Sequence, residues 1–295
     1  MVQAVEVAIA VLHGNPQRGN NMWKRFFEWL CQLFGKSERV KIKGAVCMPL
    51  FYPRDGGGHR GTWDYLNKSL KEQDECRWWI KHLTAEGETP AIAFLLTPPH
   101  QAGNIFTPWP YVNDDNIEYA REAIEKCVED GIAVFPVLYT DDLPPWWYSI
   151  GDEITYWPHV HGVIGKHVNG YILSIETNEQ ARDVGTIQEC IAMMESAMPD
   201  MDYYGVHMAW MGKGRYRWMG GDTTPFNANL ILAETSWHPK DGDRAGVDKC
   251  KKEVQAIIAN NPGVKICLHE YNWNCGAIHE RQRAMLRTLG LWGVG

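Results

Sequence analysis

Gly170-Tyr171-Ile172-Leu173-Ser174-Ile175-Glu176-Thr177-Asn178-Glu179-Gln180 begins as an apolar strand and ends in a segment rich in carboxyl and amide groups. A strand that becomes polar only at its carboxyl end is typical of a barrel or sheet whose rim carries polar groups. The stretch from Val264 to Trp273 repeats this pattern, with Glu270 at the end of its apolar run. We therefore expect chemistry where these two strands end.

The chain alternates between apolar runs typical of strands and patterns typical of helices. The expected strands cover residues 42–51, 91–97, 132–139, 171–175, 203–209, 230–233, 264–269 and 291–294. The expected helices cover residues 62–83, 115–130, 152–168, 179–198, 244–260 and 277–289. Eight strands alternating with helices predict the α/β class and a (β/α)8 TIM barrel over residues 40–295.

Two features of this pattern leave the architecture open. The last run, 290–295, stops almost as it begins, which predicts a short or incomplete eighth strand. A doubly wound open sheet is the rival architecture, but it usually shows a Gly-rich fingerprint after its first strand. Arg54-Asp55-Gly56-Gly57-Gly58-His59 does not match GxGxxG and is interpreted as a flexible loop at the rim.

Residues 1–39 form an N-terminal extension with an amphipathic helix predicted at 22–35. Its large apolar residues recur at helical spacing: Trp23, Phe26, Phe27, Leu30, Leu33 and Phe34. This helix either docks on the barrel or anchors the chain to a membrane surface or a protein partner. The apolar run 4–12 lacks the basic flank of a signal peptide and is too short to span a bilayer. Met22 is a second possible start.

Charge and cysteine usage limit the partners and the compartment. The formal net charge of −7, with both signs interspersed, argues against nucleic acid as a partner of the folded body. Eight cysteines occur without a CxxC pair or a zinc-like His spacing, so we interpret them as reduced thiols, favouring a cytoplasmic compartment over an oxidising one. Asp141-Asp142 has no clustered ligands around it, so neither a metal nor another cofactor is expected.

Two short motifs resemble those of a known enzyme clan. Residues 156–168 and 170–179 resemble the third helix and fourth strand of the retaining (β/α)8 glycoside hydrolases, the clan of cellulases, mannanases and β-galactosidases. In that clan the fourth strand ends in Asn-Glu and the seventh in Glu, which Asn178-Glu179 and Glu270 match. Gln180 stands where many relatives have Pro, and Thr177 separates Glu176 from Asn178 where β-galactosidase-like members have Glu-Asn-Glu.

The resemblance implies hydrolysis of a β-linked glycan by two carboxyl groups. Glu179 would be the acid/base, Glu270 the nucleophile, and Asn178 the partner of the sugar 2-hydroxyl. Retention needs the two carboxyls about 5–5.5 Å apart, whereas inversion needs about 6.5–9.5 Å. Glu179 could instead be a first-turn helix Glu stabilised by the helix dipole. Glu176 is then the alternative acid, and Glu234, which also follows an apolar run, is the alternative nucleophile.

Further candidates for substrate binding are aromatic or polar residues near expected strand ends. They are His207, Trp210, Trp237, Tyr271, Trp273, Trp146 and Trp147. The chain has 14 Trp, and although many pack in cores, aromatic rings in a cleft also stack on sugar rings. An inactive barrel that binds glycans and a muramidase-like enzyme that cuts cell-wall glycan are the alternative functions. The sugar and the oligomeric state stay open.

Overall fold

A computed structural model of the chain describes residues 39–49, 51–53, 59–96, 114–139, 157–174, 184–211, 229–235 and 263–270, and the single helical positions 255 and 259. The chain divides into two compact units, Met1–Glu38 and Arg39–Gly295, and every described residue belongs to the second. The helix predicted at 22–35, the helix at 277–289 and the eighth strand at 291–294 lie outside the described residues.

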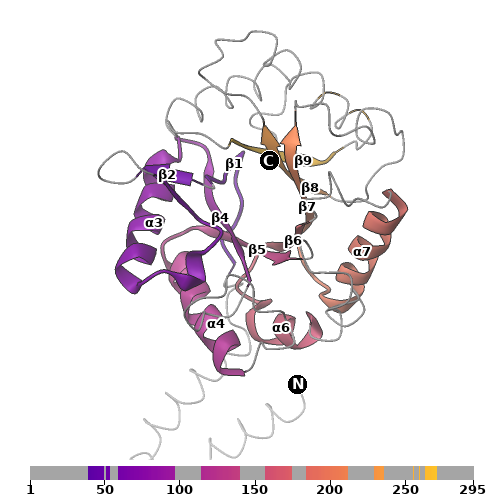
Figure 1. Ribbon diagram of the computed structural model, residues 1–295, viewed down its shortest axis with the longest axis horizontal. Coiled ribbons are helices and arrows are strands. Elements are labelled where there is room, and N and C mark those ends of the chain that lie inside the picture. The colour runs from indigo at the N-terminus through magenta and orange to yellow at the C-terminus, as the bar shows by residue number, and fades with distance from the viewer. Residues whose placement is uncertain are drawn as a thin grey trace, which may run out of the picture. The chain divides into compact units, whose positions relative to one another are not determined.

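A parallel sheet of seven strands forms the centre of the second unit, and it curls around the middle of the view in Figure 1. Its strands follow one another in chain order: β1 (Val46–Cys47), β4 (Thr89–Leu95), β5 (Ala133–Tyr139), β6 (Gly170–Ser174), β7 (Tyr203–Met211), β8 (Leu230–Thr235) and β9 (Lys265–Glu270). Every neighbouring pair is parallel. The predicted α/β class is confirmed.

In the described part of the chain, four α-helices cover the outer face of the curled sheet (Figure 1). They are α3 (Leu70–Leu83), α4 (Asp114–Glu129), α6 (Trp157–Ile164) and α7 (Val184–Ala197). A doubly wound sheet reverses its strand order at a switch point and carries helices on both faces. The described strands show no such reversal, which argues against the open-sheet alternative. Among the described residues, no helix combines the length and the apolar character needed to cross a bilayer.

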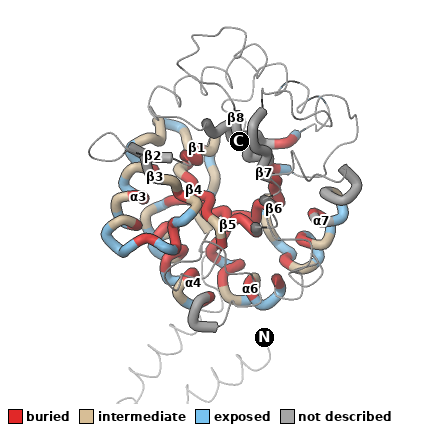
Figure 2. Tube along the Cα trace, viewed as in Figure 1, coloured by how far each residue is buried: buried red, intermediate tan, exposed pale blue. Residues whose placement is uncertain are grey.

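The strands at the centre of the sheet are largely buried (Figure 2). Their side chains divide between two clusters, as the alternation of a strand requires. On β4, Ile92 and Phe94 belong to a core shared with the four helices, whereas Ala91 and Ala93 belong to a second cluster. This second cluster, the interior cluster, contains no helical residue. Its fully buried members are Met48, Ala91, Ala93, Ala133, Phe135, Val137, Ile172 and Leu230.

The predicted first strand and first helix are both shorter in the structure. Only Val46–Cys47 of the stretch 42–51 joins the parallel sheet, and Phe51–Pro53 (β2) instead pairs antiparallel with His59–Gly61 (β3) in a small hairpin. The Gly-rich residues 54–58 between β2 and β3 lie outside the described residues. The pattern at 62–83 starts with a 3-10 turn, η1 (Tyr65–Asn67), before α3 begins.

A capping box fixes the start of α3. The Ser69 hydroxyl accepts a hydrogen bond from the Glu72 backbone N–H, and the Glu72 carboxylate accepts one from the Ser69 N–H at 3.0 Å. Two of the donors that a helix start leaves without partners are thereby satisfied. The helix therefore begins at Leu70, after a cap that the sequence Ser-Leu-Lys-Glu already contains.

Candidate functional site

Polar residues occupy the carboxyl ends of β6, β8 and β9 and the middle of β7, which continues from His207 to Met211. They are Ser174, His207, Glu234, His269 and Glu270. Strand pairing sets Ser174 beside His207, Glu234 beside His269, and Thr235 beside Glu270. Neighbouring strands lie about 4.8 Å apart, and the carboxyl ends of parallel strands share one edge. The sheet therefore gathers two carboxyl-bearing positions and one imidazole-bearing position at this edge, and His207 pairs with Leu232, two positions before Glu234.

The register of the strands sets most of these positions on the same face of the sheet, in one row across neighbouring strands. Leu230 belongs to the interior cluster, and residues two and four positions further on, Leu232 and Glu234, share its face of the strand. His269 pairs with Glu234, so it joins the same row. Ser174 follows the interior residue Ile172 by two positions, and its partner His207 follows Gly205 by two. We call Ser174, His207, Glu234 and His269 the interior row.

Glu270 occupies the alternate row of β9, together with its partner Thr235 of β8. It is also the last residue of the strand, at the point where the chain leaves the sheet. Sequence reasoning placed Glu270 at the strand end but did not distinguish the two rows, and it gave no role to His269.

Trp210 lies in an irregular part of β7. The register with β8 shifts between Met208 and Met211, so that Ala209 and Trp210 interrupt the regular pairing. His207 precedes this shift and keeps its regular partners, Ser174 and Leu232. Such irregularities re-aim side chains and are frequent beside active sites.

The other predicted site residues lie outside the described residues. They are Glu176, Asn178, Glu179, Trp146, Trp147, Trp237, Tyr271 and Trp273. Glu176, Asn178 and Glu179 follow β6, the fourth strand of the sheet, whereas Glu270 ends β9, the seventh. The Glu179–Glu270 distance, which separates retention from inversion, is therefore not defined by the described residues.

Trp63 is a candidate that sequence reasoning missed. Its backbone carbonyl accepts a hydrogen bond of 2.9 Å from the N–H of Leu95, the last residue of β4. Its side chain is partly buried and packs against the interior cluster. The preceding Thr62 is buried, and its hydroxyl donates to the Ala93 carbonyl at 2.9 Å. These bonds fix the Trp63 backbone beside the carboxyl end of β4, with its ring against the interior cluster.

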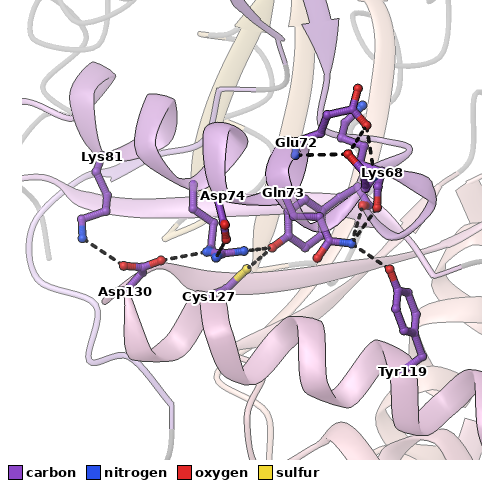
Figure 3. Close-up of polar contacts among 11 residues, drawn as sticks. Lys68, Glu72, Gln73, Asp74, Lys81, Tyr119, Cys127 and Asp130 are labelled. Carbon is purple, nitrogen blue, oxygen red and sulfur yellow. Dashed lines mark hydrogen bonds and ion pairs between the residues drawn. The ribbon is translucent and has the colours of Figure 1, made fainter.

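A second polar cluster lies between η1, α3 and α4 (Figure 3). The Tyr65 hydroxyl accepts from the Arg77 guanidinium at 2.7 Å and from the Cys127 thiol at 3.4 Å. Burial raises the pKa of the Tyr65 hydroxyl, and it raises the pKa of the Cys127 thiol to about 12. Burial also raises the pKa of the Cys76 thiol. These groups stay neutral at physiological pH, so they stabilise the helix layer and do not act as nucleophiles.

Among the described residues, no group of three or more His, Cys, Asp or Glu side chains is arranged to hold a metal ion.

Comparison with known proteins identifies no family. No family model and no curated protein matches the chain. Among solved structures it is similar to N-acetylneuraminate lyase (sialic acid aldolase) from Aliivibrio salmonicida, with 12% identity, a TM-score of 0.41, and coverage of 85% of this chain and 76% of that one. A β-glycosidase gives 10% identity, a TM-score of 0.45, and coverage of 85% and 81%.

A third solved structure, 3-dehydroquinate dehydratase from Geobacillus kaustophilus HTA426, gives 8% identity, a TM-score of 0.38, and coverage of 82% of each chain. The names of these three proteins describe different reactions.

Proposed function

We propose that the chain is a glycoside hydrolase that cleaves a β-linked oligo- or polysaccharide with retention of configuration. The sheet would close into a (β/α)8 barrel through an eighth strand at 291–294, and residues 1–39 would form a separate extension. The observation that supports this most is the order of the strands. β6, which leads into Asn178-Glu179, is the fourth strand, and β9, which ends in Glu270, is the seventh.

The chemistry needs two carboxyl groups in different protonation states. Glu179, protonated, would give its proton to the glycosidic oxygen while the ionised Glu270 attacks the anomeric carbon. Water would then release the sugar, with Glu179 acting as base. A nearby negative charge and partial burial raise the pKa of such an acid, which keeps it protonated for the first step. Asn178 would bond the sugar 2-hydroxyl.

Glu234 is the alternative nucleophile, and its register favours a role at the site. It belongs to the interior row and pairs with His269, whereas Glu270 belongs to the alternate row. A carboxylate at this position would orient a catalytic group or the substrate even if it does not attack. We therefore include Glu234 in the proposed site, with His207, Trp210 and Trp63 as substrate-binding residues.

The test compares the variants Glu179→Ala, Glu270→Ala and Glu234→Ala on a panel of aryl β-glycosides. Glu270→Ala, which lacks the nucleophile, should lower kcat by several orders of magnitude, and added azide should restore turnover with a glycosyl azide of inverted configuration as product. Azide should also restore turnover by Glu179→Ala, which lacks the acid/base, but its glycosyl azide should have retained configuration. Glu234→Ala should lose part of its activity without azide rescue. Full activity in both Glu179→Ala and Glu270→Ala would refute the mechanism.

Two other outcomes would identify the alternatives. Glycan binding without turnover, unaffected by these variants, would indicate a barrel that binds glycans without cleaving them. Clearing of peptidoglycan suspensions without hydrolysis of aryl β-glycosides would indicate a muramidase-like enzyme.

A further inference from the structure

A cleft of about 520 Å³ opens on the helix layer, outside the candidate site. It is lined by Asp74, Arg77, Trp78, Lys81, His82 and Asp130. The first five belong to α3, and Asp130 directly follows α4. α3 leads into the start of β4 and α4 into the start of β5, so this cleft lies towards the amino ends of the strands. The candidate site lies at their carboxyl ends.

Trp78 presents an aromatic surface in this cleft. The side chain is 56% exposed, although large apolar residues usually bury themselves. Its ring stacks on the His82 imidazole, with centroids 4.9 Å apart and planes 8° apart. Trp79 packs against the core shared with the helices. Its ring contacts the Trp78 ring edge-on, with centroids 4.7 Å apart, and the His82 ring edge-on, with centroids 5.4 Å apart. These contacts hold the indole in place, so little conformational entropy remains to be lost when a ligand stacks on it.

The polar groups around the indole are ordered, and their formal charges cancel. Arg77 and Lys81 contribute two positive charges, and Asp74 and Asp130 two negative charges. The Arg77 guanidinium donates to Asp130 at 2.7 Å and also to Asp74, and Lys81 donates to Asp130 at 3.3 Å (Figure 3). A balanced set of this kind does not favour a strongly charged ligand. It offers carboxylate acceptors and an ammonium donor to a ligand rich in hydroxyl groups.

Partial burial acts to raise the pKa of the Asp130 carboxyl, but the hydrogen bonds from Arg77 and Lys81 outweigh it and hold the pKa below its ordinary value. The carboxylate therefore stays ionised across the neutral range and remains a strong acceptor. Asp74 and Asp130 keep 68% and 39% of their side-chain surface exposed, so both are accessible from the cleft.

We propose that this cleft is a second carbohydrate site, in which a sugar ring of a neutral glycan stacks on Trp78 and its hydroxyl groups bond Asp74, Lys81 and Asp130. Sugar rings offer an apolar C–H face and a polar rim, which match an exposed indole ringed by charged side chains. The choice of a glycan chain over other hydroxyl-rich ligands rests on the proposed function. The site would hold polymeric substrate to the enzyme at a distance from the cleaved bond.

The test is affinity electrophoresis of the full chain in native gels that contain mixed-linkage β-glucan, glucomannan or xylan. Wild-type protein should be retarded by at least one of these glycans. Trp78→Ala should weaken the binding about fivefold, because stacking on an aromatic ring contributes on the order of 1 kcal/mol beyond simple burial. Trp78→Phe should keep part of it. Leu70→Ala is the matched control, since Leu70 is also exposed, at 58%, on α3 but does not line the cleft.

A parallel assay on small aryl glycosides keeps this proposal separate from the proposed function. Trp78→Ala should leave their hydrolysis unchanged, and Glu270→Gln should abolish hydrolysis while leaving retardation intact. Retardation that depends on Trp78 in a chain with no glycosidase activity would reject the hydrolase but keep this site. The site is overturned if Trp78→Ala is retarded like wild type, or if none of the three glycans retards wild type. A Trp78-dependent change in oligomeric state with unaltered glycan binding would also overturn it, identifying an interface between copies.

Discussion

Replacing Arg77 by Met tests whether the polar cluster under the α3 cleft stabilises the helix layer. The Arg77 side chain is only 8% exposed, and its guanidinium bonds Tyr65, Asp74 and Asp130, joining η1, α3 and the end of α4. Met keeps most of the apolar stem but removes the charge and every donor. The substitution therefore isolates the guanidinium from the packing of its stem.

The loss of stability depends on whether water can replace the guanidinium at each of its three partners. Asp74 and Asp130 are 68% and 39% exposed, so water replaces most of what they lose, and exposed ion pairs contribute little. Water cannot replace the guanidinium at the Tyr65 hydroxyl, because Tyr65 is fully buried, and the hydroxyl keeps the Cys127 thiol, a weak donor. A buried group that loses a charged partner costs about 1–3 kcal/mol. We expect Arg77→Met to lower the free energy of unfolding by about 2–3 kcal/mol in total.

Urea unfolding at pH 7 measures this loss, with Lys81→Met as the matched control. Lys81 also bonds Asp130, at 3.3 Å, but it is 49% exposed, so its removal should cost less than about 1 kcal/mol. Equal costs for the two variants would refute the reasoning, because the difference in burial would then have no effect. A cost for Arg77→Met below about 0.5 kcal/mol would refute it as well.

The difference in unfolding free energy between wild type and Arg77→Met should depend on pH, and its sign follows from the pKa of Asp130. The pKa of Asp130 is lower in the folded chain than in the unfolded chain, so its ionised form stabilises the fold. This stabilisation is fully present above the unfolded pKa of about 4 and is lost as the pH falls through the lower folded value. The stability gap between wild type and Arg77→Met should therefore narrow on acidification below about pH 4 and stay constant between pH 6 and 8.

Three further predictions concern the scaffold. Gly170→Ala should destabilise the fold by about 3 kcal/mol or prevent folding, because the new Cβ would lie 2.1 Å from the Tyr203 carbonyl oxygen. Gly162→Ala in α6 is the control: its new Cβ meets open space, so thermal unfolding should show a stabilisation of about 0.5–1 kcal/mol. The Cys127 thiol, fully buried with its pKa raised to about 12, should react with a thiol reagent at pH 8 only after unfolding. Rapid labelling of Cys127 itself in the native chain, located by peptide mapping, would contradict its burial. Ser69→Ala should cost about 1 kcal/mol in urea unfolding, with Ser69→Asp keeping most of the stability.

The fold class was predictable because it depends on long runs of side chains. β5 reads as an unbroken apolar stretch, Ala-Val-Phe-Pro-Val-Leu-Tyr, as a strand buried on both faces must. α4 was predicted to within one residue at each end, because its apolar positions recur at helical spacing between a polar start and a Gly after its end. These signals are repeated along each element, so no single residue decides them.

The departures occurred where one or two residues decide the structure. The hairpin of β2 and β3 was missed because its strands have only three residues each, too few to show alternation, although the three glycines between them indicate a turn. The late start of α3 follows from one capping box at Ser69. The role of Trp63 depends on a single backbone bond to Leu95, which no sequence pattern encodes.

The interior row could not be predicted because it depends on the register of the strands. The row also affects which roles Glu234 and Glu270 can take. A shift of one residue in register exchanges the two faces of a strand, so the row of Glu234 and Glu270 depends on pairing that sequence alone does not give. Glu234 is followed by Thr235, which still pairs with Glu270, so the ladder fixes its row. Glu270 has no paired residue after it in β9, so the alternation constrains it less. A position with paired residues on both sides suits an orienting role, whereas we assign the attacking role to the position at which β9 ends. This division predicts that azide rescues Glu270→Ala but not Glu234→Ala, and the opposite result would make Glu234 the nucleophile.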